Sequence, residues 1–325
     1  MPPPAPDDDA TVLMRRRAAY ATPRRGGGGW GAAGRAAAGL LLAGVAAWMV
    51  WPRPPPSAPA AFAIVAADEA TIRDHVADRL TVFRFAPDPA VIVLDFPTLH
   101  EQGAMLNRIA ALVEKAGLPR DRVLTDADLD AAIRKGGEMP DTYYYGHDYD
   151  AAELARFFAL ADAGHVALNA EEGRLRALLH QLGWLRPGAM GAVISVPRVP
   201  EAAAKELDAA ARAVILRHEL SHGLFFTDPA YAAHVRQFWS GTLTAAERAA
   251  VRKFLGGEGY DTGNETLMAN EGQAYLLFTD DPRFCKASDF GMTPARRAEL
   301  ARAFLHGMEP GWLRDSLARE IPRLR

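Results

Sequence analysis

Two histidines and a glutamate near the middle of the chain are spaced as metal ligands and a general base would be. The segment His218-Glu219-Leu220-Ser221-His222 lies in a stretch with helical periodicity. Histidines four residues apart on a helix project from one face, so both imidazoles can reach one metal ion. Glu219 points near the same place, where a carboxylate can take a proton from metal-bound water. The alternative is a buried helix whose histidines are only hydrogen-bonded, but two histidines on one face with a glutamate between them are uncommon.

A helix must position these side chains. We predict that it begins just after Pro200 and ends near Gly223, because glycine favours a stop. Before it, residues 192–196 have the composition of an apolar strand, which Pro197 closes. Upstream of His218, apolar residues recur at helical spacing on the face that carries the histidines, namely Leu207, Ala211, Val214 and Ile215.

A third ligand is needed to leave a zinc ion one open position for water. Residues 264–278 read as a helix, and Glu271 lies in the middle of its apolar stripe. A carboxylate buried among apolar side chains is costly unless it is paired or bound to a metal. Glu271 is therefore predicted to be the third ligand or the partner of a buried cation. A surface acid in a differently phased helix is the alternative.

Two further residues near the histidines are candidate ligands. Asp228 stands six residues after His222, where some metal-binding patterns place a third ligand. Those patterns need a glycine three residues after the second histidine, and Phe225 occupies that position. Asp228 followed by Pro229 is more typical of a turn. His234 fits no ligand spacing and falls in a predicted helix.

The pairing of His218-Glu219-x-x-His222 with Glu271-x-x-Ala274 resembles the H-E-x-x-H and E-x-x-A segments of zincin metallopeptidases, most closely the gluzincin branch. The resemblance covers residues 191–278. It implies that His218, His222 and Glu271 hold Zn²⁺ and that Glu219 activates zinc-bound water for peptide hydrolysis. Manganese, iron or cobalt suit the same ligands. One position departs from the family: many gluzincins carry an aspartate that orients a zinc-bound histidine where this chain has Tyr275.

The resemblance also implies a side chain that stabilises the oxyanion. Candidates are Tyr275, Tyr260, Tyr231 and His147, and the sequence does not separate them. His147 lies in residues 143–149, which hold four of the eight tyrosines of the chain. This segment is predicted either to form a substrate-facing wall or to be a strand whose rings pack under a glycine turn.

The N-terminal region predicts a membrane anchor. Residues 36–51 carry no charge and are predicted to be a single-pass signal-anchor, slightly shorter than the roughly 17–25 residues of an ordinary spanning helix. Arginines cluster in the basic tail, residues 1–35, predicted to be disordered, and only Arg53 closely follows the anchor. This asymmetry predicts an inner-membrane protein with a periplasmic or otherwise extracytoplasmic body. A cleaved signal peptide, or a disordered tail on a cytoplasmic protein, is the alternative.

Charge and cysteine content narrow the function classes. Residues 1–53 carry +4 and the whole chain −3, so the remainder carries −7. An acidic body argues against nucleic acid as a partner. The single cysteine, Cys285, excludes an internal disulfide and a cysteine-based metal site. The glycine-rich residues 256–263 lack the lysine of a phosphate-binding loop, which argues against nucleotide binding.

The expected fold class is α+β and mostly helical. A Pro-rich linker, residues 52–61, precedes a small α/β lobe over residues 62–140, and a zincin-like region follows over 141–325. Helix N-caps are expected at Thr125 and Thr244, the latter in a capping box. The predicted segments are a strand at 90–96 and helices at 99–116, 126–135, 151–163, 171–182, 229–239, 244–255 and 293–306.

These observations predict a membrane-anchored zinc metallopeptidase that acts on an envelope protein or peptide, with cell-wall peptide as a related possibility. The alternative from another class is a catalytically inactive zincin-like scaffold that binds an envelope partner. The intact Glu219 disfavours the scaffold, because a scaffold needs no general base.

Overall fold

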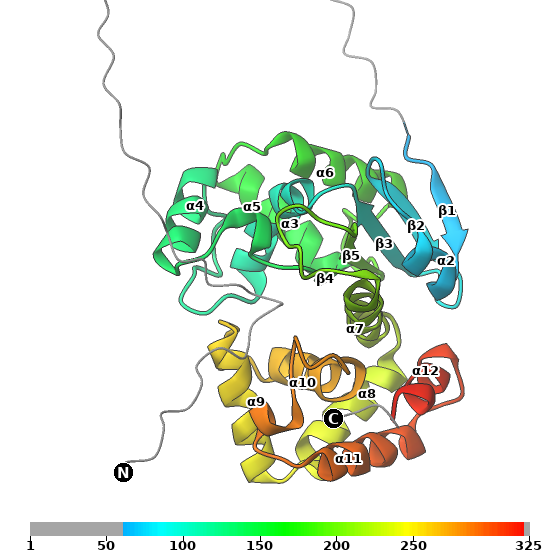
Figure 1. The fold of residues 1–325 in the computed structure, drawn as a ribbon. Coiled ribbons are helices and arrows are strands. Elements are labelled where there is room, and N and C mark those ends of the chain that lie inside the picture. Colours follow the sequence, from blue (N-terminus) through cyan, green and yellow to red (C-terminus); the bar gives the residue numbers. More distant parts are fainter. Residues whose placement is uncertain (1–60, 322–325) are drawn as a thin grey trace, which may run out of the picture. The chain divides into compact units, whose positions relative to one another are not determined.

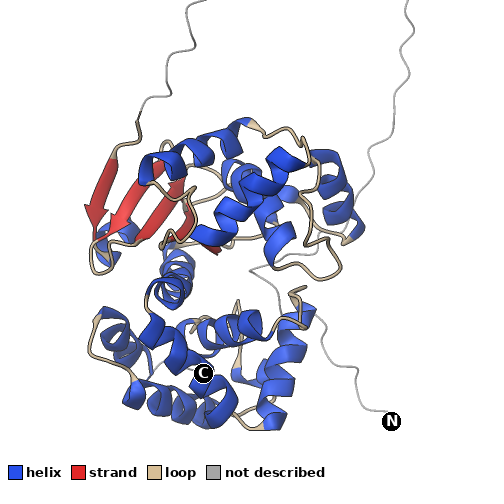
Figure 2. Ribbon diagram, turned by 180° about the vertical axis from the view of Figure 1, so that it is seen from behind, coloured by secondary structure: helices blue, strands red, loops and turns tan. Residues whose placement is uncertain are grey.

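The computed structural model describes residues 61–321 of the chain (Figures 1 and 2). Its first half contains the strands of a mixed five-stranded sheet, with helices between them. β1 and β2 are parallel, as are β3 and β5, whereas β2–β3 and β5–β4 are antiparallel. β4 therefore lies at an edge next to β5. Across the sheet the strands are β1 (Ile64–Ala67), β2 (Thr81–Phe85), β3 (Val91–Phe96), β5 (Ala192–Pro197) and β4 (His147–Asp150).

The predicted N-terminal segments lie outside the described residues. These are the basic tail (1–35), the signal-anchor (36–51) and all but the last residue of the linker (52–61). Over residues 61–321, none of the helices has both the length and the apolar character needed to cross a bilayer.

Strands β3 and β5 are buried along their whole length because helices cover both faces of the sheet. On one face, Val91 and Val93 pack with Leu216 of α7 (Ala209–Thr227). On the other face, Ile92 and Leu94 pack in the cluster that contains α3 (Leu99–Val113). A strand buried on both faces reads as a continuous apolar run, which is why the sequence located β3 and β5 correctly.

The sheet crosses the predicted boundary between the two lobes. β3 belongs to the predicted α/β lobe (62–140), whereas β4 and β5 belong to the predicted zincin-like region (141–325). β3 pairs with β5 in parallel, with Val93 opposite Ile194. The boundary therefore divides one sheet, and residues 62–321 fall within a single compact unit. Pairing between strands about a hundred residues apart has no local sequence signal.

Helix α7 starts and ends later than predicted. Asp208 is its N-cap and accepts a hydrogen bond from the amide of Ala211 at 2.8 Å. Gly223, expected to end the helix, lies inside it and against β3. A Cβ added at Gly223 would meet the Val91 methyl carbons at 3.0 and 3.1 Å. This glycine serves close packing of helix on sheet instead of chain termination.

Helix α3 ends before the predicted residue 116, because the chain turns to meet the glycine-rich loop. The amide of Ala116 donates to the carbonyl of Gly259 at 3.0 Å, and the amide of Asp261 donates to the carbonyl of Glu114 at 2.8 Å. The side chain of Glu114 is consequently buried beside the loop that leads into α10. The contact with this distant loop ends α3 at Val113, whereas the local periodicity of the sequence continues to residue 116.

The remaining helices confirm the predicted α+β, mostly helical class. Thr125 and Thr244 cap their helices as predicted, and Thr244 forms the expected capping box with Glu247. In Figure 1, α3 to α6 lie on one side of α7, and α8 to α12 lie on the other. The other helices are α2 (Glu69–Asp74), α4 (Asp126–Lys135), η1 (Pro140–Thr142), α5 (Ala151–Ala163), α6 (Ala170–Leu182), α8 (Pro229–Gln237), η2 (Phe238–Thr242), α9 (Ala245–Gly257), α10 (Glu265–Gln273), η3 (Ala274–Phe278), η4 (Ala287–Phe290), α11 (Pro294–Gly307) and α12 (Trp312–Glu320).

A buried ion pair fastens α7 to the sheet. The Arg212 guanidinium donates to both carboxylate oxygens of Asp95 at 3.0 and 2.9 Å, and both residues are at most 1% exposed.

Arg212→Met leaves the Asp95 carboxylate buried without this partner, so we expect the free energy of unfolding to fall by roughly 3–5 kcal/mol. Urea unfolding of the purified chain measures this. The control is Arg176→Met, which breaks an exposed pair with Asp162 and is expected to cost about 0–1 kcal/mol. Equal losses in the two variants would contradict the expectation.

Candidate metal centre

Helices α7 and α10 bring His218, His222 and Glu271 together. The Oε2 atom of Glu271 lies 3.9 Å from Nε2 of His218 and 3.8 Å from Nε2 of His222. The three side chains can each offer one ligand atom within 4.8 Å of the others. Donors about 2.1 Å from a tetrahedral zinc ion lie about 3.4 Å apart, so a small side-chain adjustment suffices. All three residues are at most 2% exposed.

The donor atoms of His222 and Glu271 lack hydrogen bonds. Both ring nitrogens of His222 and both carboxylate oxygens of Glu271 are buried without a hydrogen bond among the described residues. Buried polar atoms in proteins are nearly always satisfied, and an exception calls for an explanation such as a bound ion. Two imidazoles and a carboxylate form a donor set that suits zinc. These three residues therefore fit the zinc ion that the family resemblance implies.

Burial sets the protonation states in the metal-free protein. Burial lowers the pKa of His222 to about 4, although the neighbouring Asn270 side chain raises that pKa. Burial also lowers the pKa of His218 well below its ordinary value. Both imidazoles are therefore neutral at pH 7, which is the form that binds metal. Burial raises the pKa of Glu271, and the neighbouring Glu114 carboxyl raises it further. A cation at the centre would favour the ionised form of Glu271 again.

Thr279 fixes the tautomer of His218. Its hydroxyl donates to the carbonyl of Ala274 at 3.0 Å, so it accepts the hydrogen bond from Nδ1 of His218 at 2.8 Å. With the proton on Nδ1, the Nε2 atom of His218 keeps the lone pair that faces Glu271. Sequence reasoning missed Thr279, because it sought an acid at position 275. The π-helical turn η3 changes the helical register, and no sequence signal marks it.

Removing this hydroxyl should weaken metal binding. We expect Thr279→Val to lower zinc affinity by about 10–100-fold, because the His218 ring then loses the acceptor that orients it. Thr279→Ser, which keeps the hydroxyl, should retain most of the affinity. Competition with a chromophoric chelator measures both variants. If the valine and serine variants bind zinc equally, the hydroxyl has no orienting role.

Glu219 lies next to the candidate ligands and against Gly146, the residue before β4. A Cβ added at Gly146 would meet Oε1 of Glu219 at 2.0 Å, so the carboxylate occupies the space that a larger residue would need. Oε2 of Glu219 is buried and has no hydrogen-bond partner. Burial raises the pKa of Glu219, as do the nearby Glu271 and Glu114 carboxyls. The carboxylate thus lies beside the candidate ligands with its Oε2 atom free of hydrogen bonds.

Strand β4 sends alternate side chains to opposite faces. Asp148 faces the centre, where its Oδ1 atom lies 3.8 Å from Nδ1 of His222. His147 faces the other way, and its ring nitrogens contact Ser195 at 3.1 Å and Asn107 at 3.3 Å. The structure therefore does not bring His147, a predicted catalytic candidate, to the metal ligands. The tyrosines and His147 of this segment stand out in the sequence, whereas no sequence signal marks Asp148.

The candidate tyrosines differ in their positions. The ring of Tyr275 lies edge-on against the His218 ring, with centroids 4.8 Å apart. Tyr260 lies beside Glu271 and lowers the pKa of the Glu271 carboxyl, against the larger effect of burial, which raises it. Tyr231 instead donates to Gln273 at 2.8 Å, and Gln273 donates to Ser221 of α7 at 3.0 Å. Tyr231 thus helps to dock α10 against α7, while Tyr275 and Tyr260 remain beside the centre.

The two other ligand candidates have structural roles. Asp228 caps α8, accepting from the amides of Ala230 and Tyr231 at 2.8 and 3.2 Å. His234 contacts the carbonyl of Phe304 at 2.9 Å through Nε2. The structure therefore places Glu271, and neither of these residues, beside the histidine pair.

The tyrosines of residues 143–149 lie in the core. Tyr143, Tyr144, Tyr145 and Tyr149 are all at most 9% exposed. The ammonium of Lys115 lies 4.4 and 4.2 Å from the centroids of the Tyr143 and Tyr144 rings, within cation–π range. This arrangement favours internal packing over a substrate-facing wall.

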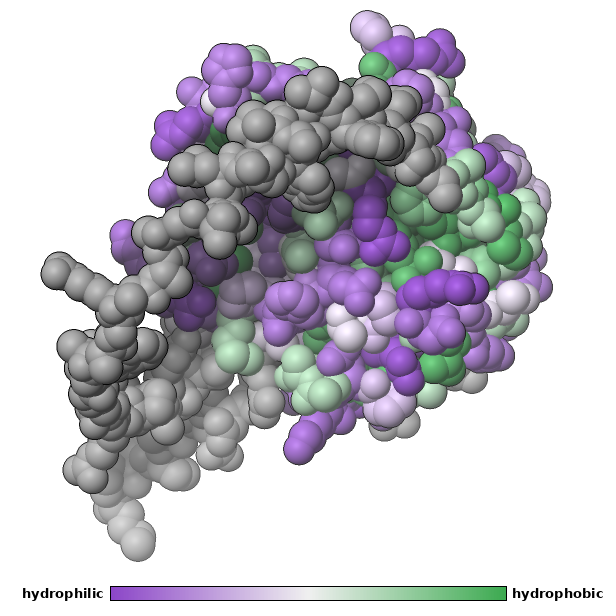
Figure 3. All heavy atoms as spheres, turned by 90° about the horizontal axis from the view of Figure 1, so that it is seen from above, coloured by the Kyte–Doolittle hydropathy of each residue, from purple (hydrophilic) through white to green (hydrophobic). Residues whose placement is uncertain are grey.

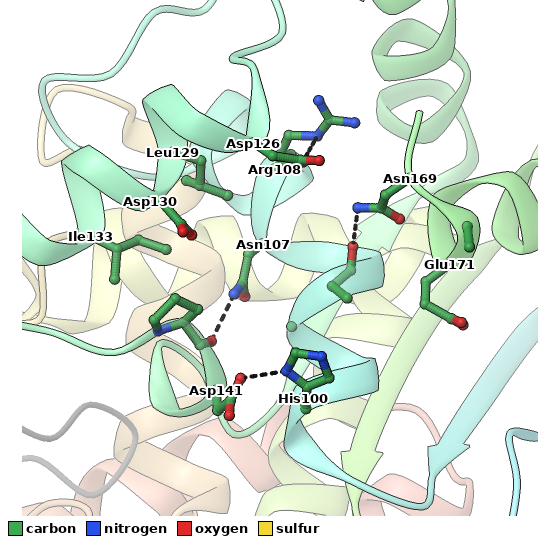
Figure 4. Close-up of a pocket in the computed structure, with 14 residues that line it drawn as sticks. His100, Asn107, Arg108, Asp126, Leu129, Asp130, Ile133, Asp141, Asn169 and Glu171 are labelled. Atoms are coloured by element: carbon green, nitrogen blue, oxygen red, sulfur yellow. Dashed lines mark hydrogen bonds and ion pairs between the residues drawn. The ribbon is translucent and has the colours of Figure 1, made fainter. Parts of the chain in front are cut away.

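A separate cavity of about 360 Å³ lies between α3, α4 and η1 (Figure 4). His100 and Asp141 contact each other across it at 2.9 Å, and Asn107 donates to the carbonyl of Pro140. None of the candidate metal ligands lines this cavity.

Seen from above, the described surface mixes hydrophilic and hydrophobic patches (Figure 3). Among the described residues, the exposed large hydrophobic side chains are Val65, Val76, Met139 and Met190.

Comparison of the chain with protein-family models, with curated proteins and with solved structures finds no match.

Proposed function

We propose that this chain is a zinc-dependent metallopeptidase of the zincin class, with a gluzincin-like ligand set of His218, His222 and Glu271. One observation carries the proposal: the buried donor atoms of His222 and Glu271 converge without hydrogen bonds, beside a glutamate, Glu219, whose Oε2 atom is also buried without one. A purely structural histidine pair would have its nitrogens hydrogen-bonded.

The chain's own residues supply the other functions that hydrolysis needs. Zinc, when bound, would polarise the scissile carbonyl and make water available as a nucleophile near neutral pH. Glu219 would accept the proton of the attacking water and pass it to the leaving amine. Thr279 would hold the His218 ring in the ligating tautomer. Tyr275 and Tyr260 are the candidates for stabilising the oxyanion, and their buried hydroxyls stay protonated because burial raises both pKa values.

The proposed substrate is a peptide or protein of the cell envelope. The sequence feature that supports this is the predicted signal-anchor at residues 36–51. In this proposal the anchor holds the acidic body on the extracytoplasmic side of the inner membrane. The acidic charge of the body argues against a nucleic-acid partner.

Metal content of the purified full chain tests the proposal. We expect about one zinc per wild-type chain, and loss of that zinc in His222→Ala and Glu271→Ala. His180→Ala is the matched control, because His180 lies exposed in the last turn of α6. Zinc retained in both ligand variants would refute the ligand set.

One observation favours the alternative of a catalytically inactive scaffold. His218, Glu219, His222 and Glu271 are all at most 3% exposed, so a substrate reaches them only if neighbouring groups move. Hydrolysis of an unstructured protein such as casein separates the two functions. Zinc bound in one equivalent, with no zinc-dependent cleavage of casein or of a peptide library, would support the scaffold.

A further inference from the structure

A second group of oxygen donors adjoins the candidate zinc ligands. Glu114, Asp148 and Glu271 each offer one carboxylate oxygen, and these three atoms lie within 4.8 Å of one another. The residues come from the end of α3, from β4 and from α10. Glu271 is common to both groups, so the two donor sets are contiguous.

These carboxylates are concentrated in the interior. Glu114 and Glu271 are 4% and 1% exposed, and the Asp148 side chain is 12% exposed. Tyr149 donates to Oε1 of Glu114 at 3.2 Å, which supplies a neutral partner only. Burial raises the pKa of Glu114 and of Glu271, and the ammonium of Lys115, which also lies against tyrosine rings, lowers both pKa values. Three carboxylates with oxygens within 4.8 Å of one another, two of them buried, repel one another unless protons or cations compensate them.

A small cavity provides room for a cation. Its volume is about 60 Å³, and its lining includes Glu114, Asp148 and Asn270, whereas Glu271 does not line it. A cavity that holds one water needs roughly 10–15 Å³, so this one accommodates an ion with water. The Asn270 side chain is 3% exposed, and its Oδ1 atom is buried without a hydrogen-bond partner. Asn270, whose side chain also acts on the pKa of His222, therefore adds an amide oxygen to the carboxylates at this cavity.

We propose that Glu114, Asp148 and Glu271, with the amide oxygen of Asn270, bind a second divalent cation beside the zinc site. The donors are all oxygen, which selects a hard cation such as Ca²⁺, Mg²⁺ or Mn²⁺ over zinc. This inference rests on the proposed function only through Glu271, which would bridge the two ions. The second cation would neutralise the acidic group and hold Glu271 in place for the histidine pair.

Metal titration of the chelator-treated full chain tests this site. Zinc is added first to one equivalent, and Mn²⁺ binding is then counted by electron paramagnetic resonance, with Ca²⁺ and Mg²⁺ as competitors. We expect one zinc and one Mn²⁺ per chain. Terbium provides an independent probe, because Tyr149, in contact with Glu114, can sensitise its luminescence.

Three variants make the titration specific. Glu114→Gln should retain the zinc and lose the Mn²⁺ and the sensitised terbium signal. Glu153→Gln is the matched control, because Glu153 lines the same cavity but is outside the donor group, and it should bind both ions. His222→Ala should lose the zinc and keep the Mn²⁺.

The outcomes separate the two proposals. A wild-type chain that binds zinc but no Mn²⁺, or a Glu114→Gln chain that binds Mn²⁺ as the wild type does, overturns the second site and leaves the zinc site standing. Mn²⁺ binding that depends on Glu114 in a chain that binds no zinc supports the second site and overturns the proposed function. If Glu114→Gln does not fold, Asp148→Asn takes its place, and the wild-type stoichiometry decides by itself.

Discussion

Replacing Glu219 by glutamine is expected to lower kcat/KM for peptide hydrolysis by roughly 10²–10⁴-fold, the usual contribution of a general base. An amide has nearly the shape of a carboxylate but does not accept and return a proton at neutral pH. Glu219 is outside the His218–His222–Glu271 ligand group, so zinc content should stay at the wild-type level. Steady-state cleavage of a fluorogenic peptide and metal analysis of the same sample give both quantities.

The control for this substitution is Glu299→Gln, which changes an exposed acid of α11 with a side chain 58% accessible. That variant should keep both activity and zinc. Wild-type activity in Glu219→Gln would remove the general base from the mechanism. Loss of zinc in Glu219→Gln would show instead that the carboxylate is itself a ligand.

Gly146→Ala is expected to reduce kcat by about 100-fold, because a displacement of about 1 Å in a catalytic group costs a factor of that order. The new Cβ would lie 2.0 Å from Oε1, 2.6 Å from Cδ and 2.9 Å from Cγ of Glu219. These distances are shorter than any van der Waals contact, so the Glu219 carboxylate must move. The three atoms nearest to this Cβ all belong to Glu219 and none to a candidate zinc ligand, so zinc content is expected not to change.

The matched control is Gly173→Ala, since a Cβ at Gly173 meets nothing within 4 Å. Alanine in this exposed position of α6 should leave kcat unchanged and stabilise the chain by about 0.5–1 kcal/mol. A double-mutant cycle adds a sharper criterion. In a Glu219→Gln chain, Gly146→Ala should cause little further loss, because both changes act through one side chain. Two full, multiplied losses would mean that Gly146 acts on something other than Glu219.

Local sequence signals predicted the secondary structure well where one segment contains all the information. Thr125 and Thr244 were recognised as N-caps because capping depends on residues within one turn. The boundaries of α3 and α7 were wrong for the opposite reason. Gly223 stays helical because Val91, on a distant strand, fills the space that a Cβ would occupy. A glycine that permits close packing and a glycine that ends a helix look the same in sequence.

The sequence by itself determined the chemistry of the centre: His218 and His222 on one helical face, Glu219 between them, and Glu271 as a carboxylate within an apolar stripe. Each follows from a period of 3.6 residues and the cost of burying charge. Only the tertiary structure decided the surroundings, where pairing of β4 with β5 places Gly146 against Glu219 and Asp148 near His222. Contacts between Glu114–Ala116 and the glycine-rich loop bring a further carboxylate to Glu271. These groups come from segments far apart in the chain, and their proximity is a property of chain topology, which no local periodicity encodes.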